Sequence, residues 1–510
     1  MATLSWSTNW AISWHLQHSP DNPLAARQAL TTLLRRKGRI LDLLTQNQQL
    51  LRQQLEPENR ALLAQLVTLN TQLTNLEYLK PEQITSPQEH RQQIEQLTRE
   101  TQQLEAKLSR ISSRFRVEAE PVTLETIQAL IPDNTVLIEI VRYQTYDPKN
   151  NRWGSYRYGA YVLRSTGEPL GIDLGEAATI DDKVENFRLQ LAQDIPIKQT
   201  KERGQILEKL VFAKIRPFLD QDEQILLSPD GELNLIPFEA LVDENDNYLV
   251  ENYRFTYLSS GRDLIRLAAH SPSMAPPVLM GNPNFVLSSS TVAQRGDSRY
   301  SPLSNIGWPK LPGTAKEIAE IAKLFDDAQI FTQEQANEFN LKQVQSPSIL
   351  HLATHGFFVA PQQFSNPLAA TGLALAGVQQ RGDGDIENGL FTALEAVNLD
   401  LKGTQLIVLS ACDTGLGTVE TGEGIYGLRR SFVIAGSQTQ IISLWRVDDQ
   451  GTKDLMVDYY NKLLKEKKGR RQGLRELQLE MINGDKGDNY QHPYYWSSFI
   501  LSGDSSSLQF

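Results

Sequence analysis

The chain has 510 residues, of which 40% are hydrophobic and 22% charged, and its formal net charge is −11. This length allows two to four domains, each with enough residues for its own core. The acidic balance argues against a general nucleic-acid binder, because no basic excess is present to displace counterions from phosphates. A local basic run, KEKKGRR (465–471), is interpreted as a solvated helix end.

Other features of composition bear on the compartment. No stretch approaches 18 uninterrupted apolar residues, so we expect no membrane span. The first residues, MATLSWSTNWAISWHLQ, have neither a basic start nor a small-residue cleavage site, which argues against secretion. The only cysteine, Cys412, cannot form an internal disulfide and leaves no cysteine-based metal cluster. These features predict a cytoplasmic protein.

The first 118 residues are predicted to be helical and coiled-coil-like. Leucines recur at steps of three, four or seven residues from 30 to 76, which places them on one helix face. Two prolines interrupt this pattern within 80–89, and it resumes over 94–111. We therefore expect an antiparallel helical hairpin. Its apolar stripe over 30–76 should dock either on the rest of the chain or on a protein partner.

A mixed α/β unit is predicted for residues 119–270, hereafter the companion unit. Its histidine content is limited to His270, and it has no cysteine, so a structural or regulatory role is favoured over acid–base chemistry. The segment 225–241 is predicted to be a strand, an Asp-Gly turn and a second short run. The other expected strands are 136–143, 158–165 and 169–175, with helices near 181–193 and 206–218.

Residues 271–510, hereafter the C-terminal unit, alternate between strand and helix patterns. This alternation predicts a doubly wound, mostly parallel sheet with helices on both faces. Thr314 and Glu317 have the spacing of a capping box at the start of a helix over 314–325. The expected strands are 276–281, 328–332, 348–356, 405–411, 438–445 and 496–503, with further helices at 336–344, 424–435, 449–467 and 471–482.

Two residues able to form a catalytic pair stand at the ends of two predicted strands. His355 closes SILHLATHG (348–356), and Cys412 follows QLIVLSA (405–411). If these strands are parallel neighbours, both side chains emerge at one edge of the sheet. A cysteine thiol has a pKa of about 8.5, and an imidazole beside it favours the thiolate. The same imidazole later protonates the leaving amine. The backbone N–H groups of Gly356 and Cys412 are the expected oxyanion donors.

Each of these residues also has a simpler interpretation. A free cysteine at a strand end is more often inert packing, and a histidine there is more often a satisfied surface residue. Their conjunction at two strand ends, each before a glycine-containing turn, makes the case for catalysis about as strong as the case for packing.

The motifs around these residues resemble the CHAT domain family, caspase-like cysteine peptidases of clan CD that are often fused to tetratricopeptide repeats. The matching segments are HLATHGFF (351–358), SACDTGLG (410–417), GEGIYGLRRSFVIAG (422–436), LSPDGELNLIPFEAL (227–241), LPGTAKEI (311–318), RGDGD (381–385), SLWRVDD (443–449) and HPYYWSSFILSG (492–503).

The resemblance implies a caspase/separase-like fold over roughly residues 120–505. It implies a dyad in which His355 is the general acid and base and Cys412 is the nucleophile, with no cofactor. The companion unit would be a degenerate, pseudo-caspase-like subdomain, so that 119–510 together form the CHAT domain. The stretch 13–42 resembles the segment that follows the repeats in family members, and no 34-residue repeat is visible in the N-terminal helical region (1–118).

Acidic residues near the predicted edge suggest a specificity. Asp413 directly follows the cysteine, and Asp448 and Asp449 follow the strand at 438–445. They could select a basic residue before the scissile bond, as separases and metacaspases do; alternatively, Asp448 or Asp449 caps the next helix.

Metal binding is not favoured by the remaining motifs. His351 and His355 form an HxxxH spacing, but in a strand without the glutamate of HExxH we interpret His351 as a packed, hydrogen-bonded residue that supports the site. Asp383 and Asp385 could bind a cation, although a solvent loop is the better interpretation.

The first-choice function is a cysteine endopeptidase that cleaves a protein substrate through a thioester acyl-enzyme. The alternative is a catalytically silent caspase-like scaffold that binds a protein partner through the N-terminal helices. A different cysteine-dependent acyl transferase shares the chemistry but lacks a recognisable acyl-carrier or cofactor motif.

Overall fold

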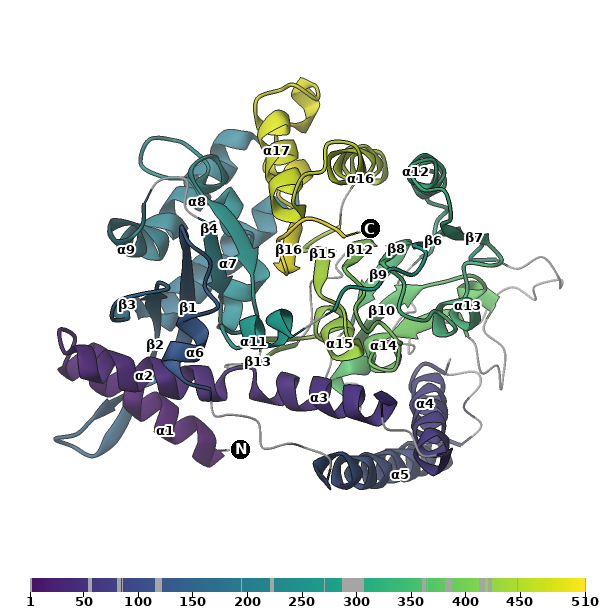
Figure 1. Cartoon of the computed structure of the whole chain (residues 1–510), viewed down its shortest axis with the longest axis horizontal. Helices are drawn as coiled ribbons and strands as arrows, with labels where there is room; N and C mark the ends of the chain where they lie inside the picture. The colour runs from purple at the N-terminus through teal and green to yellow at the C-terminus, as the bar shows by residue number, and fades with distance from the viewer. Residues whose placement is uncertain are drawn as a thin grey trace.

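The computed structural model of the chain (Figure 1) describes residues 2–53, 57–79, 84, 86–114, 122–193, 195–220, 224–269, 271–286, 307–359, 364, 366–380, 388–411, 418–420, 424–446 and 448–509. One 11-stranded sheet runs through both predicted units. Its strands are Thr135–Asp147 (β1), Arg152–Leu163 (β2), Leu170–Glu176 (β3), Gln224–Ser228 (β4), Arg254–Tyr257 (β5), Val278–Pro283 (β6), Gln329–Gln333 (β7), Ile349–Ala353 (β8), Leu406–Ser410 (β12), Thr439–Ser443 (β15) and Phe499–Gly503 (β16).

The strand order is β3-β2-β1-β4-β5-β16-β15-β12-β8-β6-β7. Neighbours are parallel except β3–β2, β2–β1 and β16–β15. Because β16 is parallel to β5 but antiparallel to β15, the two halves of the sheet run in opposite directions. The predicted mostly parallel α/β sheet is confirmed, and the carboxyl ends of β4 and β12 lie at opposite edges.

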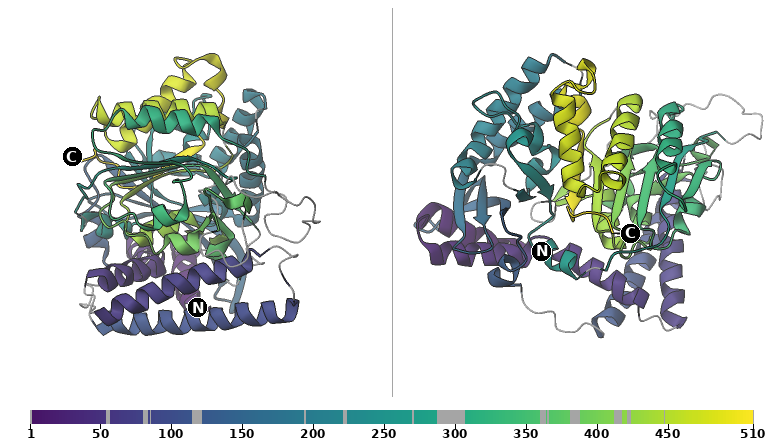
Figure 2. Two further views of the ribbon diagram at one scale, coloured as in Figure 1. Left: turned by 90° about the vertical axis from the view of Figure 1, so that its right-hand side faces the viewer. Right: turned by 45° about the horizontal axis from the view of Figure 1, so that its top comes forward.

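Helices cover both faces of the sheet (Figure 2). Helices Pro312–Ala322 (α12), Asp449–Leu464 (α16) and Arg470–Ile482 (α17) lie on one face, and Ala393–Ala396 (α14) and Leu428–Ala435 (α15) lie on the other. The remaining helices of the two units are Leu124–Gln128 (α6), Ala177–Leu191 (α7), Ile197–Leu210 (α8), Phe212–Ile215 (α9), Leu249–Asn252 (α10), Asp263–Ala268 (α11), Glu338–Lys342 (α13) and Pro493–Trp496 (α18).

The central strands β8, β12 and β15 are buried on both faces. All five residues of each are buried, as expected for the continuous apolar runs of parallel strands under two helix layers. Strand β1 instead alternates between two cores: Ile138 and Ile140 pack toward α7, whereas Leu137 and Val141 pack toward the N-terminal helices. The sheet is therefore a rigid frame for the residues at its edges.

The predicted strand at 348–356 is wrong in one respect, because it divides at Thr354. The Thr354 hydroxyl donates to the Ala374 carbonyl at 2.5 Å, and the Thr354 amide donates to the Ser410 carbonyl at 3.3 Å. The chain then leaves the large sheet as His355–Phe358 (β9), which pairs with Thr371–Ala374 (β10); β10 in turn pairs with Leu390–Thr392 (β11). His355 thus begins a second strand.

Other boundaries also differ from expectation. The second run within 225–241 forms two short 3₁₀ turns, Gly231–Leu235 (η4) and Phe238–Ala240 (η5). The predicted helix at 424–435 begins only at Leu428, because Gly424–Tyr426 (β14) pairs with Thr418–Glu420 (β13).

The basic run at 465–471 is predicted to be a solvated helix end, but part of it is buried. Arg470 and Arg471 begin α17 and are buried. The Arg470 guanidinium donates to Asp504 at 2.6 Å, and Arg471 lies 3.3 Å from Glu239 in an ion pair. Two of the charges that would form a basic patch are therefore neutralised inside the protein.

The N-terminal region contains the predicted hairpin within a longer helical array. Its elements are Ala2–Ser13 (α1), a π-helical turn at Trp14–His18, Pro23–Arg36 (α2), Arg39–Gln53 (α3), Pro57–Glu77 (α4) and Pro87–Arg114 (α5). Leu66 and Leu69 of α4 cluster with Leu104 and Leu108 of α5, and Leu73 clusters with residues near the start of α5. The two helices are therefore antiparallel, as the break at 80–89 predicts.

Much of the described apolar stripe docks on the chain itself, although Leu44 is 40% exposed. Leu30, Leu33 and Leu34 of α2 are buried in a core shared with β1 and β2, and Leu41 of α3 clusters with Val433 and Ile434 of α15. Figure 1 shows α2 and α3 running one after the other beneath the two halves of the sheet. No helix in the described part of the chain combines the length and apolar character of a membrane span.

Candidate active site

The register of β8 and β12 brings the residues that precede the two predicted catalytic positions to equivalent points in the sheet. The strands are parallel neighbours, and Ala353 stands opposite Ser410. His355 comes two residues after Ala353, and Cys412 two residues after Ser410. Cys412 and Asp413 lie outside the described residues, so the geometry of the site is that of His355 and the segments around the strand ends.

His355 is held in a pocket of aromatic rings. Its side chain is buried, with ring centroids 5.2 Å from Phe285 and 5.7 Å from Trp308. Its Nε2–H donates to the Pro309 carbonyl at 2.8 Å. A carbonyl can only accept, so in the neutral ring Nε2 carries the proton and Nδ1 keeps its lone pair. The tautomer is therefore set by the backbone of residue 309.

Burial also sets the charge state of this imidazole. Desolvation by the aromatic pocket lowers the pKa of His355 below its ordinary value of 6.5, and the hydrogen bond to Pro309 opposes this shift. Smaller effects come from Arg446, which lowers the pKa, and from Asp449, which raises it. The ring is therefore predominantly neutral at pH 7 and able to accept a proton through Nδ1.

Gly356 follows His355 with its amide turned away from the neighbouring strand. The Val359 amide donates to the Ala370 carbonyl, and hydrogen-bonded pairs alternate along an antiparallel ladder. Gly356, opposite Leu373, is therefore at a non-hydrogen-bonded position. Its N–H points away from β10, toward the outer side of β9, which is an edge strand of this three-stranded sheet.

Both described acidic candidates have backbone partners. Asp448 accepts from the Gly451 amide at 2.7 Å and so caps α16, while Asp449 accepts from the Gly313 amide at 2.6 Å. Asp448 also lines an open cavity of about 780 Å³ with Lys486, Tyr490, Tyr495 and residues at the start of α8. The cap does not remove the carboxylate from this cavity.

A buried polar cluster lies beneath the strand ends. The Ser410 hydroxyl donates to Glu317 Oε2 at 3.1 Å, and Glu317 Oε1 lies 3.0 Å from His351 Nε2 without the alignment of a hydrogen bond. His351 Nδ1 shares a hydrogen bond with the Tyr460 hydroxyl at 3.2 Å. His351 is thus a packed, hydrogen-bonded residue, as expected. Within the described ranges no three potential ligands are grouped to hold a metal; Asp383 and Asp385 lie outside these ranges.

The capping box predicted for Thr314 and Glu317 is not formed. Helix α12 begins at Pro312 with Leu311 as its N-cap residue, and the Glu317 side chain faces the sheet. Sequence analysis therefore missed two groups of the site, the Pro309 carbonyl and the Glu317 carboxylate. The motif LPGTAKEI contains Glu317, but the spacing of Glu317 from Thr314 is also typical of a capping box, so the sequence alone does not place this side chain at the site.

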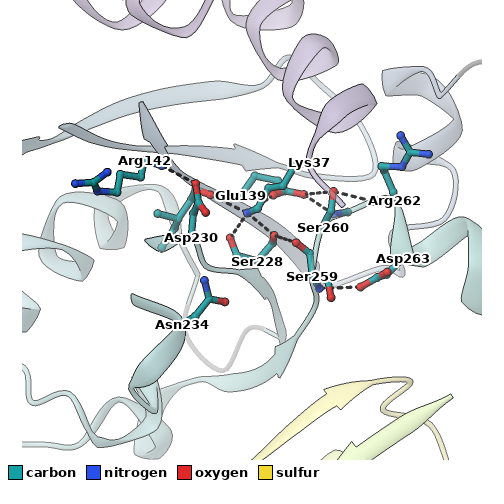
Figure 3. Close-up of polar contacts among 12 residues, drawn as sticks. Lys37, Glu139, Arg142, Ser228, Asp230, Asn234, Ser259, Ser260, Arg262 and Asp263 are labelled. Atoms are coloured by element: carbon teal, nitrogen blue, oxygen red, sulfur yellow. Dashed lines mark hydrogen bonds and ion pairs between the residues drawn. The ribbon is translucent and has the colours of Figure 1, made fainter. Parts of the chain in front are cut away.

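The corresponding edge of the companion unit is filled by a lysine from the N-terminal helices (Figure 3). Lys37, at the end of α2, places Nζ 3.0 Å from Glu139 Oε2 and 2.6 Å from Ser228 Oγ. Further carbonyl acceptors belong to Ile140, at 2.8 Å, and Ser228, at 2.9 Å. Lys37 thus joins the end of α2 to β1 and β4 at this edge.

A CHAT domain model matches residues 201–504, which is more than half of the chain. The protein therefore belongs to the CHAT domain family, as the motifs predict. Tetratricopeptide repeat protein 28 of Homo sapiens is 24% identical over 311 residues, and its Mus musculus counterpart 23% identical over 310. Each match covers 56% of this chain but only 12% of the relative.

Two solved structures show more distant similarity. The separase–securin complex of Saccharomyces cerevisiae is 11% identical, with a TM-score of 0.45 and coverage of 78% of this chain and 31% of that chain. The Arg-specific cysteine proteinase gingipain R (RgpB) of Porphyromonas gingivalis is 13% identical, with a TM-score of 0.37 and coverage of 65% and 75%.

Proposed function

We propose that the protein is a cysteine endopeptidase in which His355 and Cys412 act on a peptide bond of a protein substrate. The observation that carries this proposal is the pairing of Ala353 with Ser410 in neighbouring parallel strands. His355 and Cys412 each follow one of these paired residues by two positions. The chemistry belongs to residues 271–510. The N-terminal helices (1–118) and the companion unit (119–270) would support it.

The proposed reaction has two steps. His355 Nδ1 accepts the thiol proton as Cys412 Sγ attacks the scissile carbonyl, and the imidazolium then gives this proton to the leaving amine as the C–N bond breaks. A thioester to Cys412 remains. Water attacks the thioester with His355 again as base, releasing the carboxylic acid and restoring the thiol.

The oxyanion of each tetrahedral intermediate would be held by backbone amides. The orientation of the Gly356 N–H away from β10 supports its role as one donor, and the Cys412 N–H is the proposed second. Donors fixed in a folded backbone need no reorganisation when charge develops, which is why such groups lower the barrier.

The proposed specificity is for arginine or lysine before the scissile bond. Asp448 beside Tyr490 and Tyr495 combines a carboxylate with aromatic rings, and both attract a guanidinium or ammonium group. Lys486 lines the same cavity, but its ammonium is paired with Asp458 and Glu480. Asp413 and Asp449 are the further acidic candidates. A silent scaffold remains the alternative, although Leu30, Leu33 and Leu34 of α2 are buried against the chain itself and offer no partner surface.

Labelling of the only thiol tests the function and the specificity together. Peptidyl acyloxymethyl ketones carrying arginine, aspartate or leucine next to the electrophile are incubated with the full chain, and the labelled residue is mapped by mass spectrometry. We expect the arginine reagent to label Cys412 fastest. His355→Ala should slow labelling about 100-fold or more, whereas His18→Ala, an exposed histidine, should not. Equal rates in His355→Ala and the wild type contradict the dyad, and a preference for aspartate or leucine contradicts the acidic pocket.

The pH profile should reflect the aromatic pocket. Protonation of His355 removes the base, so activity falls as the pH drops through the pKa of this residue. Because burial lowers that pKa, the acid limb of kcat/KM is expected below pH 6.5. Trp308→Ala should admit water and move the limb upward, whereas Phe339→Ala, an exposed ring, should leave it in place. An acid limb at or above pH 6.5 in the wild type would be inconsistent with a desolvated imidazole.

A further inference from the structure

Glu317 connects the two strands that precede the dyad residues. Its carboxylate accepts from Ser410 of β12 through Oε2, at 3.1 Å, and lies 3.0 Å from His351 of β8 through Oε1. Ser410 is 4% exposed, Glu317 1% and His351 0%. The carboxylate therefore has no contact with bulk water and acts on these two strands.

The two contacts lie on one face of the sheet, near the ends of the strands that precede the catalytic positions. Successive side chains of a strand alternate between faces, and Val408, two residues before Ser410, stands opposite His351, so Ser410 and His351 share a face. Ser410 is two residues before Cys412, and His351 is four before His355. A carboxylate that contacts both strands fixes the position of each strand end relative to the other and to α12.

The segment that carries Glu317 also contacts His355 itself. Pro309, three residues before α12, accepts from His355 Nε2 at 2.8 Å, and Trp308 packs on the same ring. Gly313, in the first turn of α12, donates to Asp449 at 2.6 Å, and a Cβ at this glycine would lie 2.6 Å from atoms of Asp449. One short segment, residues 308–317, thus contacts β8, β12, the imidazole and the start of α16.

A buried carboxylate is a poor choice for stability alone. Removing it from water is costly, and apolar residues of similar volume often stabilise a core as well or better. The hydrogen bond from Ser410, however, fixes the relative position of β12 and α12 more sharply than apolar contacts do, because a hydrogen bond depends on distance and angle. The 3.0 Å approach of the same carboxylate to His351 adds a polar contact on β8. A carboxylate retained between two strands at this edge is explained by the alignment that it imposes.

We propose that Glu317 is a positioning residue of the His355–Cys412 pair, acting through Ser410 and His351. The inference rests on the proposed peptidase function. In the aligned pair, alkylation of Cys412 is assisted by neutral His355, so its rate follows deprotonation of the imidazole. In a misaligned pair the thiol reacts only after its own ionisation, near pH 8.5. A displacement of about 1 Å is enough to cost a hundredfold in rate.

The test is the pH dependence of Cys412 alkylation by iodoacetamide in full-length chains. Glu317→Gln keeps the shape and removes the charge, and Glu320→Gln is the matched control, because this carboxylate lies on the same helix, half exposed, paired with Lys323. We expect the wild type and Glu320→Gln to show a midpoint below pH 6.5. We expect Glu317→Gln to react about 10- to 100-fold more slowly at pH 7, with the midpoint displaced toward 8.5.

The outcomes separate this inference from the proposed function. A wild-type midpoint near 8.5 overturns the dyad and the inference together. A low wild-type midpoint that is unchanged in folded Glu317→Gln overturns the positioning role alone. If Glu317→Gln does not fold, as judged by circular dichroism, Ser410→Ala replaces it, since this variant removes only the hydroxyl contact; an unchanged midpoint there overturns the inference, and an upward shift supports it.

Discussion

Replacing His355 with alanine is expected to lower kcat/KM for peptide cleavage about 100- to 10,000-fold, the usual contribution of a general acid–base group. The loss should appear in kcat rather than in KM, because the imidazole acts on protons during bond breaking and contributes little to ground-state binding. Steady-state kinetics on an arginine-containing peptide measure both constants.

A conservative replacement sharpens this prediction. His355→Gln can still donate from its side-chain amide to the Pro309 carbonyl but cannot carry the thiol proton, so its kcat should be as low as that of His355→Ala. His18 is exposed, and its ring is hydrogen-bonded to the Tyr146 carbonyl in the companion unit. His18→Ala should therefore retain wild-type kinetics. A His355→Gln variant with near wild-type kcat would show that the ring only fills space.

Replacing Lys37 with alanine is expected to destabilise the fold by about 3–5 kcal/mol, the cost of leaving a buried charge without its partner. The Glu139 carboxylate is fully buried and, within the part of the chain that the structure describes, would keep the Gly261 amide and the Ser260 hydroxyl, the latter at 3.3 Å. Figure 3 shows that Lys37 and Ser260 reach this carboxylate from different elements. Equilibrium urea unfolding, followed by circular dichroism, measures the loss.

Two further variants test the cause of this loss. Lys37→Met with Glu139→Leu removes both charges and keeps most of the volume, so it should recover much of the stability lost in Lys37→Ala. Lys323→Ala breaks an exposed ion pair and should cost less than about 1 kcal/mol. If Lys37→Ala unfolds like Lys323→Ala, the N-terminal helices are not anchored through this lysine.

The elements that sequence analysis predicted best are those with one dominant physical signal. The apolar runs at β8, β12 and β15 have no polar face, which is typical of parallel strands under two helix layers. The prolines within 80–89 correctly separate α4 from α5. Both signals are local, so they can be recognised without knowledge of the partner segment.

The parts that could not be predicted depend on contacts between distant residues. The break at Thr354 arises from acceptors at Ala374 and Ser410, and the His355 tautomer depends on a carbonyl 46 residues away. Glu317 fits a capping box in sequence, and only the packing of α12 on the sheet turns it inward. Arg470 and Arg471 belong to a charged run, yet their partners bury them.

The most direct test of the peptidase assignment is detection of the acyl-enzyme. The full chain is mixed with an arginine peptide ester, quenched in acid and measured by intact-protein mass spectrometry, followed by peptide mapping. The proposal predicts an added mass equal to the acyl fragment, located on Cys412 and absent from Cys412→Ala, which should also fail to cleave. Cleavage that persists in Cys412→Ala, or binding of the peptide with neither adduct nor cleavage, would contradict the assignment.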